Sequence, residues 1–152
     1  MKVLIVGNMG YVGPGVVSLL RSKYPEAELI GFDIGYFAHC LANAPHVPEV
    51  ALNSQVYGDI RKFPEALLDG VDAVVDLAAI SNDPMGNKYE DVTMAVNYKA
   101  AVELARLGKK HGVKKFVYAS SCSMYGAASE YPKKEDDSLN PLTAYARSKV
   151  AA

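Results

Sequence analysis

The chain has few cysteines, no long hydrophobic run and no excess of charge of one sign. Among its 152 residues, no apolar stretch approaches the roughly 20 residues that a membrane-spanning helix needs. Acidic and basic residues nearly balance, at 17 and 16, so bulk charge predicts no binding to nucleic acid or to a membrane surface. Cys40 and Cys122 lie far apart without metal-ligand spacing, which argues against a metal site and fits a reducing compartment. We therefore expect a cytoplasmic protein with no membrane, nucleic-acid or metal partner.

Short apolar runs alternate with longer segments of helical period. The longer runs are apolar on both faces, as is typical of strands in a parallel sheet that is covered on two sides. The runs are KVLIVG (2–7), AELIGFD (27–33), SQVYGD (54–59), VDAVVDLAA (71–79) and KKFVYASS (114–121). Because strand alternates with helix, the sequence predicts an α/β fold of the Rossmann type, with a doubly wound parallel sheet. The right-handed crossover rule favours the strand order 3-2-1-4-5, and further strands are expected beyond this fragment.

Two segments have a clear helical pattern. Residues 11–25 place apolar side chains near one face, with Pro14 in the first turn and Pro25 after the end. Residues 90–113 are long and amphipathic, with a basic last turn and Gly112 as the expected stop. Residues 35–53 contain two prolines and no regular period, so we expect a long loop or a short helix there.

The segment VGNMGYVG carries glycines directly after the first predicted strand, at Gly7, Gly10 and Gly13. Gly7 permits a tight turn, Gly10 lets the backbone approach a pyrophosphate, and Gly13 lets the following helix pack closely against the strand. The N-terminus of that helix offers free N–H groups and a positive dipole end to phosphates. The pattern indicates a dinucleotide-binding turn, and a tight strand-to-helix turn without a ligand is the alternative.

Two aspartates end the second and third predicted strands. Asp33 is placed to accept hydrogen bonds from the hydroxyls of an adenosine ribose, and it would repel a 2′-phosphate. No arginine follows it directly, so NAD is favoured over NADP. Asp59 could accept from an adenine amino group at the same edge. The alternatives are a solvated strand-end carboxylate for Asp33 and a helix N-cap near Arg61 for Asp59, and the second is compatible with adenine binding.

Seven short motifs occur together along the chain in a specific order. They are GNMGYVG (7–13), Asp33, GDI (58–60), DLAA (76–79), VNYKA (96–100), ASSCSMYG (119–126) and NPLTAYARSK (140–149). In this order and spacing they resemble the N-terminal half of the extended short-chain dehydrogenase/reductase family, in its NAD-dependent epimerase/dehydratase branch that acts on nucleotide sugars. Members of that family are considerably longer. The resemblance therefore implies that residues 1–152 form an incomplete NAD-binding Rossmann domain. It also implies that a C-terminal substrate domain is absent from this chain, which alone should bind NAD weakly and turn over sugar poorly.

The resemblance also implies roles for residues that match the family's motifs. At the pyrophosphate the resemblance places the three glycines with Tyr11 and Val12. At the ribose it places Asp33 and Ile34, and at the adenine Asp59 and Ile60. The remaining cofactor-binding positions are Leu77, Ala78 and Ala79 at the end of the fourth strand, and Asn97 on the following helix. Ser121, Tyr145 and Lys149 match the catalytic residues, and the last two also face the cofactor. Relatives dimerise through two long helices, at about 87–111 and from 141 onward here, so a homodimer is expected.

Tyr145 and Lys149 stand four positions apart in a helix-prone run, so they share one helix face. A neutral tyrosine is a poor base at neutral pH, but a nearby ammonium favours the phenolate. Tyr145 could then take a proton from a sugar hydroxyl that Ser121 holds in line, while the cofactor takes the hydride. A surface tyrosine beside a solvated lysine is the alternative.

The residues after Ser121 discriminate among the family's reactions. The 4,6-dehydratases of the family place an Asp-Glu pair there, where this chain has Cys122 and Ser123, so dehydration is disfavoured. Cys122 is expected to be a small buried residue. The sequence therefore predicts an NAD-dependent nucleotide-sugar epimerase. A nucleotide-sugar reductase or dehydratase of the same family, and a non-catalytic NAD-binding module, remain alternatives.

Overall fold

A computed structural model describes residues 1–40, 48–81, 83–127 and 131–152. They form two compact units. Unit 1 contains Met1–Ala78 and Glu103–Ala119, and unit 2 contains Ala79–Val102 and Ser120–Ala152. Because the chain leaves unit 1 after the fourth strand and returns to it within a helix, each unit is built from two separate stretches of sequence.

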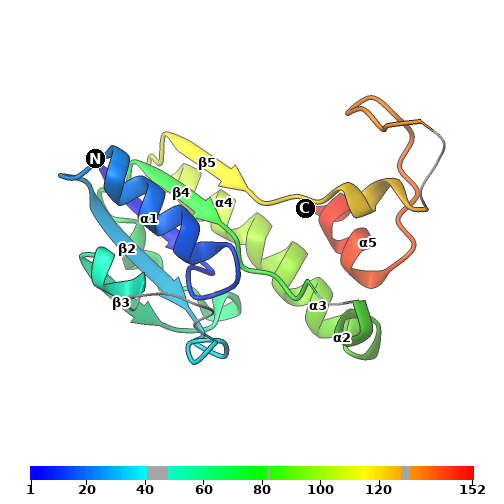
Figure 1. Cartoon of the computed structure of the whole chain (residues 1–152), viewed down its shortest axis with the longest axis horizontal. Helices are drawn as coiled ribbons and strands as arrows, with labels where there is room; N and C mark the ends of the chain where they lie inside the picture. The colour runs from blue at the N-terminus through cyan, green and yellow to red at the C-terminus, as the bar shows by residue number, and fades with distance from the viewer. Residues whose placement is uncertain (41–47, 82, 128–130) are drawn as a thin grey trace. The chain divides into compact units, whose positions relative to one another are not determined.

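Unit 1 is built on a five-stranded parallel sheet. Its strands are β1 (Lys2–Val6), β2 (Glu28–Asp33), β3 (Ser54–Tyr57), β4 (Ala73–Asp76) and β5 (Lys115–Tyr118). They lie in the order β3-β2-β1-β4-β5, so β1 occupies the centre (Figure 1). The predicted fold class and strand order are both confirmed. All five strands point the same way, which brings their carboxyl ends, and the motifs that follow them, to one edge of the sheet.

Helix α1 (Gly13–Lys23) covers one face of this sheet, and α4 (Ala101–Lys110) lies behind the other (Figure 1). Under α1, the buried side chains of Val3, Ile5, Val17 and Leu29 form a common cluster with Ala27. Alternate residues of β1 therefore point to opposite faces, and both faces are apolar because both are covered. As predicted, Pro14 lies in the first turn of α1, where its missing N–H costs no hydrogen bond.

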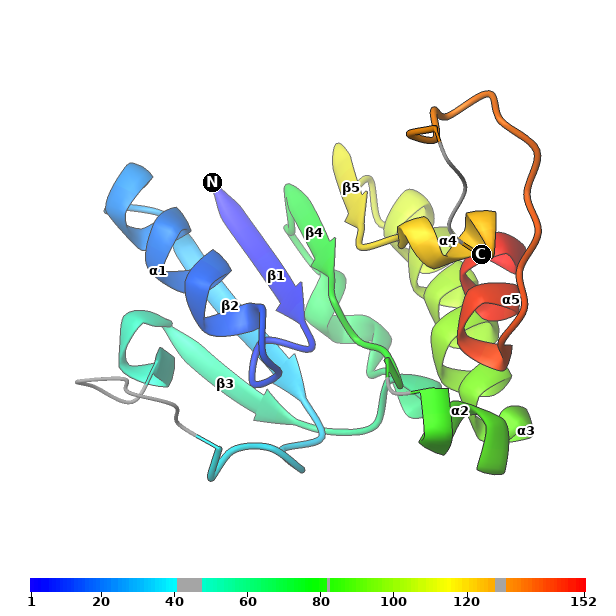
Figure 2. The same cartoon turned by 45° about the vertical axis from the view of Figure 1, so that its right-hand side comes forward.

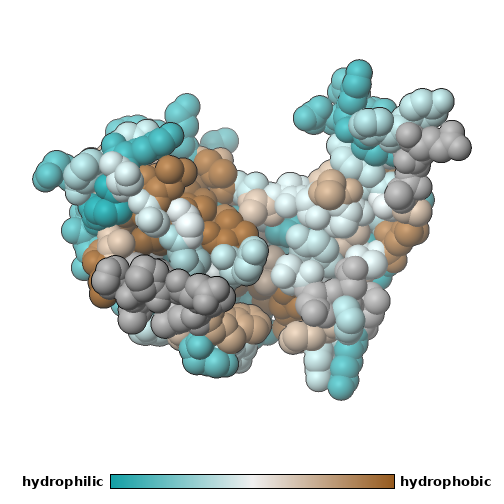
Figure 3. Space-filling model, viewed as in Figure 1, coloured by the Kyte–Doolittle hydropathy of each residue, from teal (hydrophilic) through white to brown (hydrophobic). Residues whose placement is uncertain are grey.

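The part of the sheet beside α1 carries exposed hydrophobic surface. Figure 3 shows hydrophobic residues gathered on this face of unit 1, over β4 and β5. Val75 and Val117 are paired in the register of these strands and so lie on the same face, and Val117 is 56% exposed. The helical cover of unit 1 is thus more complete over β1 than over β5.

The connections before and after β3 are short 3-10 turns. They are η1 (Pro48–Ala51), η2 (Ile60–Lys62) and η3 (Glu65–Leu68). In the predicted irregular segment 35–53, turns at 36–39 precede η1, while residues 41–47 lie outside the described part of the chain. The prediction of a long loop or a short helix therefore holds for the described ends of this segment.

Unit 2 is mainly helical. It contains α2 (Asp83–Lys88), α3 (Glu90–Met94), a π-helical stretch η4 (Ala95–Ala100), the 3-10 turn η5 (Cys122–Tyr125) and α5 (Ala144–Ala151). Helix α5 packs against α2, α3, η4 and η5, and Figure 2 shows it beside α3. The long helix predicted over 90–113 forms as α3, η4 and α4 in succession, and Gly112 follows it with a positive φ of 76°. The π stretch was not predicted. Among the helices described, none has the length and apolar character of a membrane span.

Candidate active site

The glycine turn lies at the carboxyl end of β1. Gly7 has a φ of 79°, a conformation that side chains other than glycine rarely adopt, and its N–H donates to the Phe32 carbonyl over 2.8 Å. A Cβ atom at Gly7 would lie only 2.6 Å from the backbone nitrogen of Ala78. The turn therefore passes directly against the end of β4, which brings Leu77 and Ala78 beside it.

Gly13 has a different reason to lack a side chain. A Cβ atom there would lie 2.1 Å from the carbonyl oxygen of Asn8, so the first residue of α1 sits directly on the main chain of the turn. We predicted a close approach of helix and strand; the observed contact is with the loop residue that follows the strand. Gly10 is less confined, because a Cβ atom there would meet only the Gly7 oxygen, at 3.5 Å. Its predicted role towards a pyrophosphate stays a prediction.

Asp33 holds the turn from the end of β2. One of its carboxylate oxygens accepts the N–H of Met9 over 2.9 Å, and the other accepts the N–H of Gly35 over 2.7 Å. The carboxylate is thus fixed beside the glycine turn, and each oxygen keeps a further lone pair. Ile34 follows it and is exposed. Two other residues assigned to the cofactor, Tyr11 and Val12, are also exposed, Tyr11 completely.

Asp59 at the end of β3 is an N-cap. Its side chain accepts the backbone N–H of Arg61 over 2.9 Å and also bonds the Arg61 guanidinium through both oxygens. This hydrogen-bonded guanidinium holds the pKa of the Asp59 carboxyl below its usual value, against the opposing effect of partial burial. The cap that we considered as an alternative role is therefore present. Ile60 is buried directly after it, which fixes the end of β3.

Ser121 in unit 2 caps the turn η5. Its hydroxyl oxygen accepts the N–H of Ser123 over 3.2 Å and lies 2.9 Å from the Ser123 hydroxyl. The two hydroxyls form one hydrogen-bonded pair at the start of η5, which itself packs against α5. Cys122 between them is exposed, so the expectation that it is buried was wrong. No residue of η5 is buried, so this exposure is common to the whole turn.

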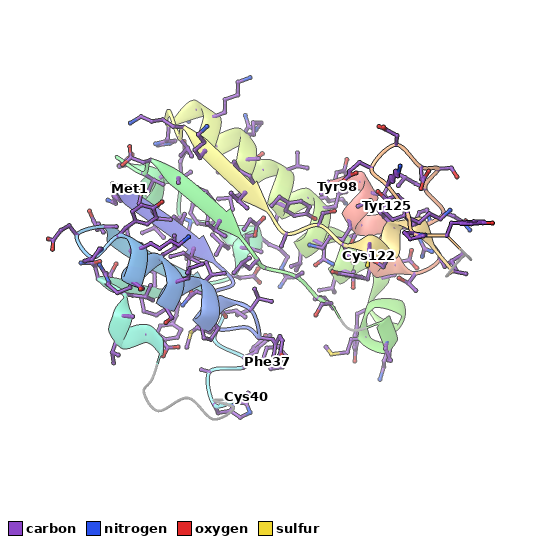
Figure 4. All side chains as sticks on the ribbon, turned by 45° about the horizontal axis from the view of Figure 1, so that its top comes forward. Met1, Phe37, Cys40, Tyr98, Cys122 and Tyr125 are labelled. Atoms are coloured by element: carbon purple, nitrogen blue, oxygen red, sulfur yellow. The ribbon has the colours of Figure 1, made fainter. Side chains whose placement is uncertain are left out.

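Helix α5 carries both Tyr145 and Lys149. The helix begins because the hydroxyl of Thr143 accepts the N–H of Ala146 over 3.1 Å. The Lys149 amine lies 5.7 Å from the centre of the Tyr145 ring, and Lys149 is only 4% exposed. The alternative of a solvated lysine is therefore excluded. In Figure 4 the labelled residues Cys122 and Tyr125 of η5 and Tyr98 of η4 lie around this helix.

Asn97 fastens α5 to the segment after β4. Its side-chain oxygen accepts the Ile80 N–H over 2.8 Å, and its nitrogen donates to the Ile80 carbonyl over 3.1 Å and to the Ser148 hydroxyl over 3.0 Å. Ser148 in turn donates to the Tyr145 carbonyl over 2.7 Å. Asn97 and Ser148 are both completely buried. Ser148 thus sits within the helix turn between Tyr145 and Lys149, and Asn97 fixes the backbone next to Ala79.

Sequence reasoning missed Ser148. It precedes Lys149 in the recognised motif, but nothing in the local pattern separates a buried serine from an exposed one. Its partner Asn97 was expected to position the active-site backbone, and the bonds to Ile80 are of that kind.

Each unit brings together one part of the predicted site. In unit 1 the glycine turn meets Asp33, Leu77 and Ala78, and in unit 2 Asn97, Tyr145 and Lys149 lie on helices that pack together with the turn of Ser121. The predicted convergence of these groups on one cofactor stays a prediction. Within the described residues, no cluster of three or more His, Cys, Asp or Glu side chains is arranged to hold a metal ion.

A central strand followed by a glycine turn and a helix, in a parallel sheet of this order, defines the class of Rossmann-type dinucleotide-binding folds. Within that class, the chain belongs to the NAD dependent epimerase/dehydratase family, whose model matches residues 3–152. The members of this family are enzymes, and the resemblance expressed by the sequence motifs is confirmed.

Among curated proteins, the chain is 31% identical to the Bacillus subtilis protein named "Uncharacterized UDP-glucose epimerase YtcB", over 99% of this chain and 49% of that protein. It is 26% identical to the mouse dTDP-D-glucose 4,6-dehydratase, over 99% of this chain and 44% of that enzyme. The chain therefore spans about half the length of the curated relatives it matches.

Solved structures agree with this placement. The NAD-dependent NDP-hexosamine 5,6-dehydratase TunA has a TM-score of 0.83 at 27% identity, over 99% of this chain and 46% of that one. MoeE5 in complex with UDP-glucose and NAD has a TM-score of 0.82 at 25% identity, with the same coverage of both chains.

Proposed function

We propose that the protein is an NAD-dependent nucleotide-sugar epimerase in which Tyr145 is the general base. The observation that carries the proposal is the pairing on α5, where the buried Lys149 amine lies 5.7 Å from the centre of the Tyr145 ring. A buried lysine amine beside the ring is the arrangement expected of a tyrosine that exchanges a proton with a sugar hydroxyl. A binding module without turnover would not need a buried lysine beside this tyrosine.

The residues of unit 1 fit NAD. No side chain stands between the turn and a diphosphate at Gly10, where the nearest atom to a Cβ would be the Gly7 oxygen. Asp33 keeps lone pairs for the ribose hydroxyls while its two backbone bonds fix its position, and its charge disfavours the 2′-phosphate of NADP. The exposed side chains of Tyr11 and Val12 would lie against the pyrophosphate. The family is NAD-dependent, and the MoeE5 structure contains NAD.

The chain's own groups divide the chemistry among them. Bound NAD supplies a nicotinamide ring that accepts a hydride and can return it. Tyr145 in its deprotonated form accepts the proton of the sugar hydroxyl at the carbon that is oxidised and becomes a neutral phenol, with the Lys149 amine beside its ring. Ser121 donates to the same sugar oxygen and holds it in line with Tyr145. The Ser121 hydroxyl is already oriented, because it accepts the Ser123 N–H and pairs with the Ser123 hydroxyl.

Epimerisation is favoured over dehydration by the residues after Ser121. Elimination of water needs an acid and a base near the sugar, and here the two following positions hold an exposed cysteine and Ser123, whose hydroxyl is paired with Ser121. Neither side chain is a carboxyl group. Several relatives named UDP-glucose epimerase agree with this choice, and relatives named dTDP-glucose 4,6-dehydratase also occur.

The experiment begins with the complete protein, as the cell makes it, purified without added cofactor. Mass analysis of the released ligand should identify NAD, and addition of UDP-glucose should yield UDP-galactose without net consumption of NAD. An empty site that takes up NADPH would instead indicate a reductase. A 4-keto-6-deoxy product would indicate a dehydratase.

The assembly we propose is a cytoplasmic homodimer formed through the two long helices. Exposed apolar residues on the helices of unit 2 support this pairing, namely Val92, Val102 and Val150. Light scattering after size-exclusion chromatography should give twice the mass of one chain, and the substitution Val102→Glu should shift the mass to that of a monomer.

A further inference from the structure

Asn8 lies inside the glycine turn but is not part of the glycine pattern. It follows Gly7, and it is 2% exposed although its side chain is polar. Its amide nitrogen donates to the side-chain oxygen of Gln55 over 2.6 Å, and the Gln55 nitrogen faces the Asn8 oxygen at 3.4 Å. The two amides therefore pair face to face, and the Gln55 nitrogen also donates to the Val56 carbonyl over 3.1 Å.

The amide pair spans the width of one strand. Gln55 belongs to β3, the turn follows β1, and β2 lies between those two strands in the sheet. The pair passes over Gly31 of β2, whose register partner in β3 is Gln55. A Cβ atom at Gly31 would lie 2.4 Å from the Gln55 oxygen and 2.7 Å from the Asn8 nitrogen. The missing side chain at position 31 thus makes room for this bond.

The main chain of Asn8 is confined from its other side. The first residue of α1, Gly13, packs on it so closely that a Cβ atom there would lie 2.1 Å from the Asn8 oxygen and 2.5 Å from its Cα. The position of Asn8 consequently sets where α1 begins. The free N–H groups of that first turn are the ones that phosphates bind at such a helix.

We propose that Asn8 and Gln55 are positioning residues that hold the glycine turn and the start of α1 in the geometry that binds the diphosphate of NAD. The inference rests on the proposed binding of NAD at this turn. Loss of the Gln55 amide leaves the Asn8 nitrogen buried without this acceptor. The turn must then shift to reach another acceptor or water, which moves the N–H groups that contact the phosphates. Binding of the adenosine end depends instead on Asp33, which the Gly35 N–H also holds, so the affinity for adenosine should change much less.

The test compares ligands with and without phosphates on the variant Gln55→Met. Dissociation constants for NAD, ADP and adenosine are measured on the whole protein, the weak ones by NMR titration. We expect NAD and ADP to bind about five- to tenfold more weakly, as the loss of one hydrogen bond predicts, and adenosine to change less than about twofold. Ser54→Ala, an exposed position at the start of the same strand, is the matched control and should leave all three constants unchanged.

The double variant separates positioning from a general loss of stability. If the pair acts as one unit, Asn8→Ala combined with Gln55→Met should weaken ADP binding no more than Asn8→Ala alone. Should the methionine variant fail to fold by circular dichroism, Gln55→Ser carries the same comparison with a smaller side chain. Unchanged ADP binding, an equal loss for adenosine, or additive losses in the double variant would each overturn the inference. A wild-type protein that binds neither NAD nor ADP would instead overturn the proposed function and the inference with it.

Discussion

The glycine turn of unit 1 and the tyrosine helix of unit 2 are held in place by different means. In unit 1 close main-chain contacts exist because side chains are missing at Gly7 and Gly13, and the bare Gly31 makes room for the amide pair of Asn8 and Gln55. In unit 2 the important contacts are made by buried side chains, which join Asn97 to Ile80 and to Ser148. The glycine turn of unit 1 is therefore shaped by close packing around glycines, and the tyrosine helix of unit 2 by a satisfied polar network.

This difference suits the two tasks. A diphosphate is bound mainly by backbone N–H groups, so the chain must approach it closely, and glycine permits that approach. Proton transfer needs side chains whose positions are fixed to within a fraction of an ångström, and hydrogen bonds from buried amides and hydroxyls provide such constraints. The comparison predicts that unit 1 is most sensitive to added atoms and unit 2 to removed ones.

The largest effect on stability should come from adding a Cβ atom at Gly13, the first residue of α1. In Gly13→Ala the new Cβ would lie 2.1 Å from the Asn8 carbonyl, so the turn or the helix must move, and we expect a loss of about 3 kcal/mol in the free energy of unfolding. Gly15→Ala is the matched control, because it lies in the same helix and has no neighbouring atom within 4 Å. Alanine there should stabilise the helix by up to about 1 kcal/mol. Denaturant titration of both variants measures the difference, and equal stabilities would contradict the packing assigned to Gly13.

The second-largest effect is expected from removing the amine of Lys149 in unit 2. In Lys149→Met the positive charge beside Tyr145 is lost, so turnover should fall about a hundredfold. Lys109→Met, at an exposed position of α4, should leave turnover unchanged. A Lys149→Met enzyme with wild-type turnover would show that the amine does not act in the reaction.

A smaller loss of stability and turnover is expected when the hydrogen bonds of Ser148 are removed. Ser148→Ala removes an acceptor from Asn97 and a donor to the Tyr145 carbonyl, both buried, so unfolding should become easier by about 1–2 kcal/mol. Turnover should fall with little change in NAD affinity, because the glycine turn and Asp33, which we propose for the diphosphate and the ribose, lie in unit 1. Ser138→Ala, which is exposed, is the control for both measurements. If Ser148→Ala weakened NAD binding more than it slowed turnover, the division of tasks between the two units would be wrong.

The smallest effect concerns the cap at the end of β3. Arg61 lowers the pKa of Asp59 in the folded chain. This carboxylate therefore stabilises the fold at pH values above its unfolded pKa of about 3.8, and the stabilisation is lost as the pH falls through the lower pKa of the folded state. Arg61→Gln should therefore destabilise the protein at neutral pH but not in strong acid. The arginine is partly exposed, so we expect no more than about 1 kcal/mol. Unfolding curves at several pH values test this, with the exposed Lys133→Gln as the control; a difference that persists in strong acid would point to packing instead.

The fold and the elements of the site were predictable from the sequence, because strand-forming runs, glycine spacing and the Tyr145–Lys149 interval are local patterns. Cys122 was predicted wrongly, since its exposure depends on the turn that Ser121 caps. The polar contacts of Asn8, Gln55 and Ser148 were missed for a related reason. Each joins residues far apart in the chain, and a buried amide or hydroxyl has the same local surroundings in sequence as an exposed one.

The most direct test of the account measures bound NAD and epimerisation on the same samples of wild-type protein and Tyr145→Phe. The account predicts equal amounts of bound NAD, conversion of UDP-glucose to UDP-galactose by the wild type, and a loss of conversion of at least about a hundredfold in the variant. Tyr131→Phe, at an exposed tyrosine, should behave as the wild type. A Tyr145→Phe protein that keeps wild-type turnover would contradict the assignment of Tyr145 as the base.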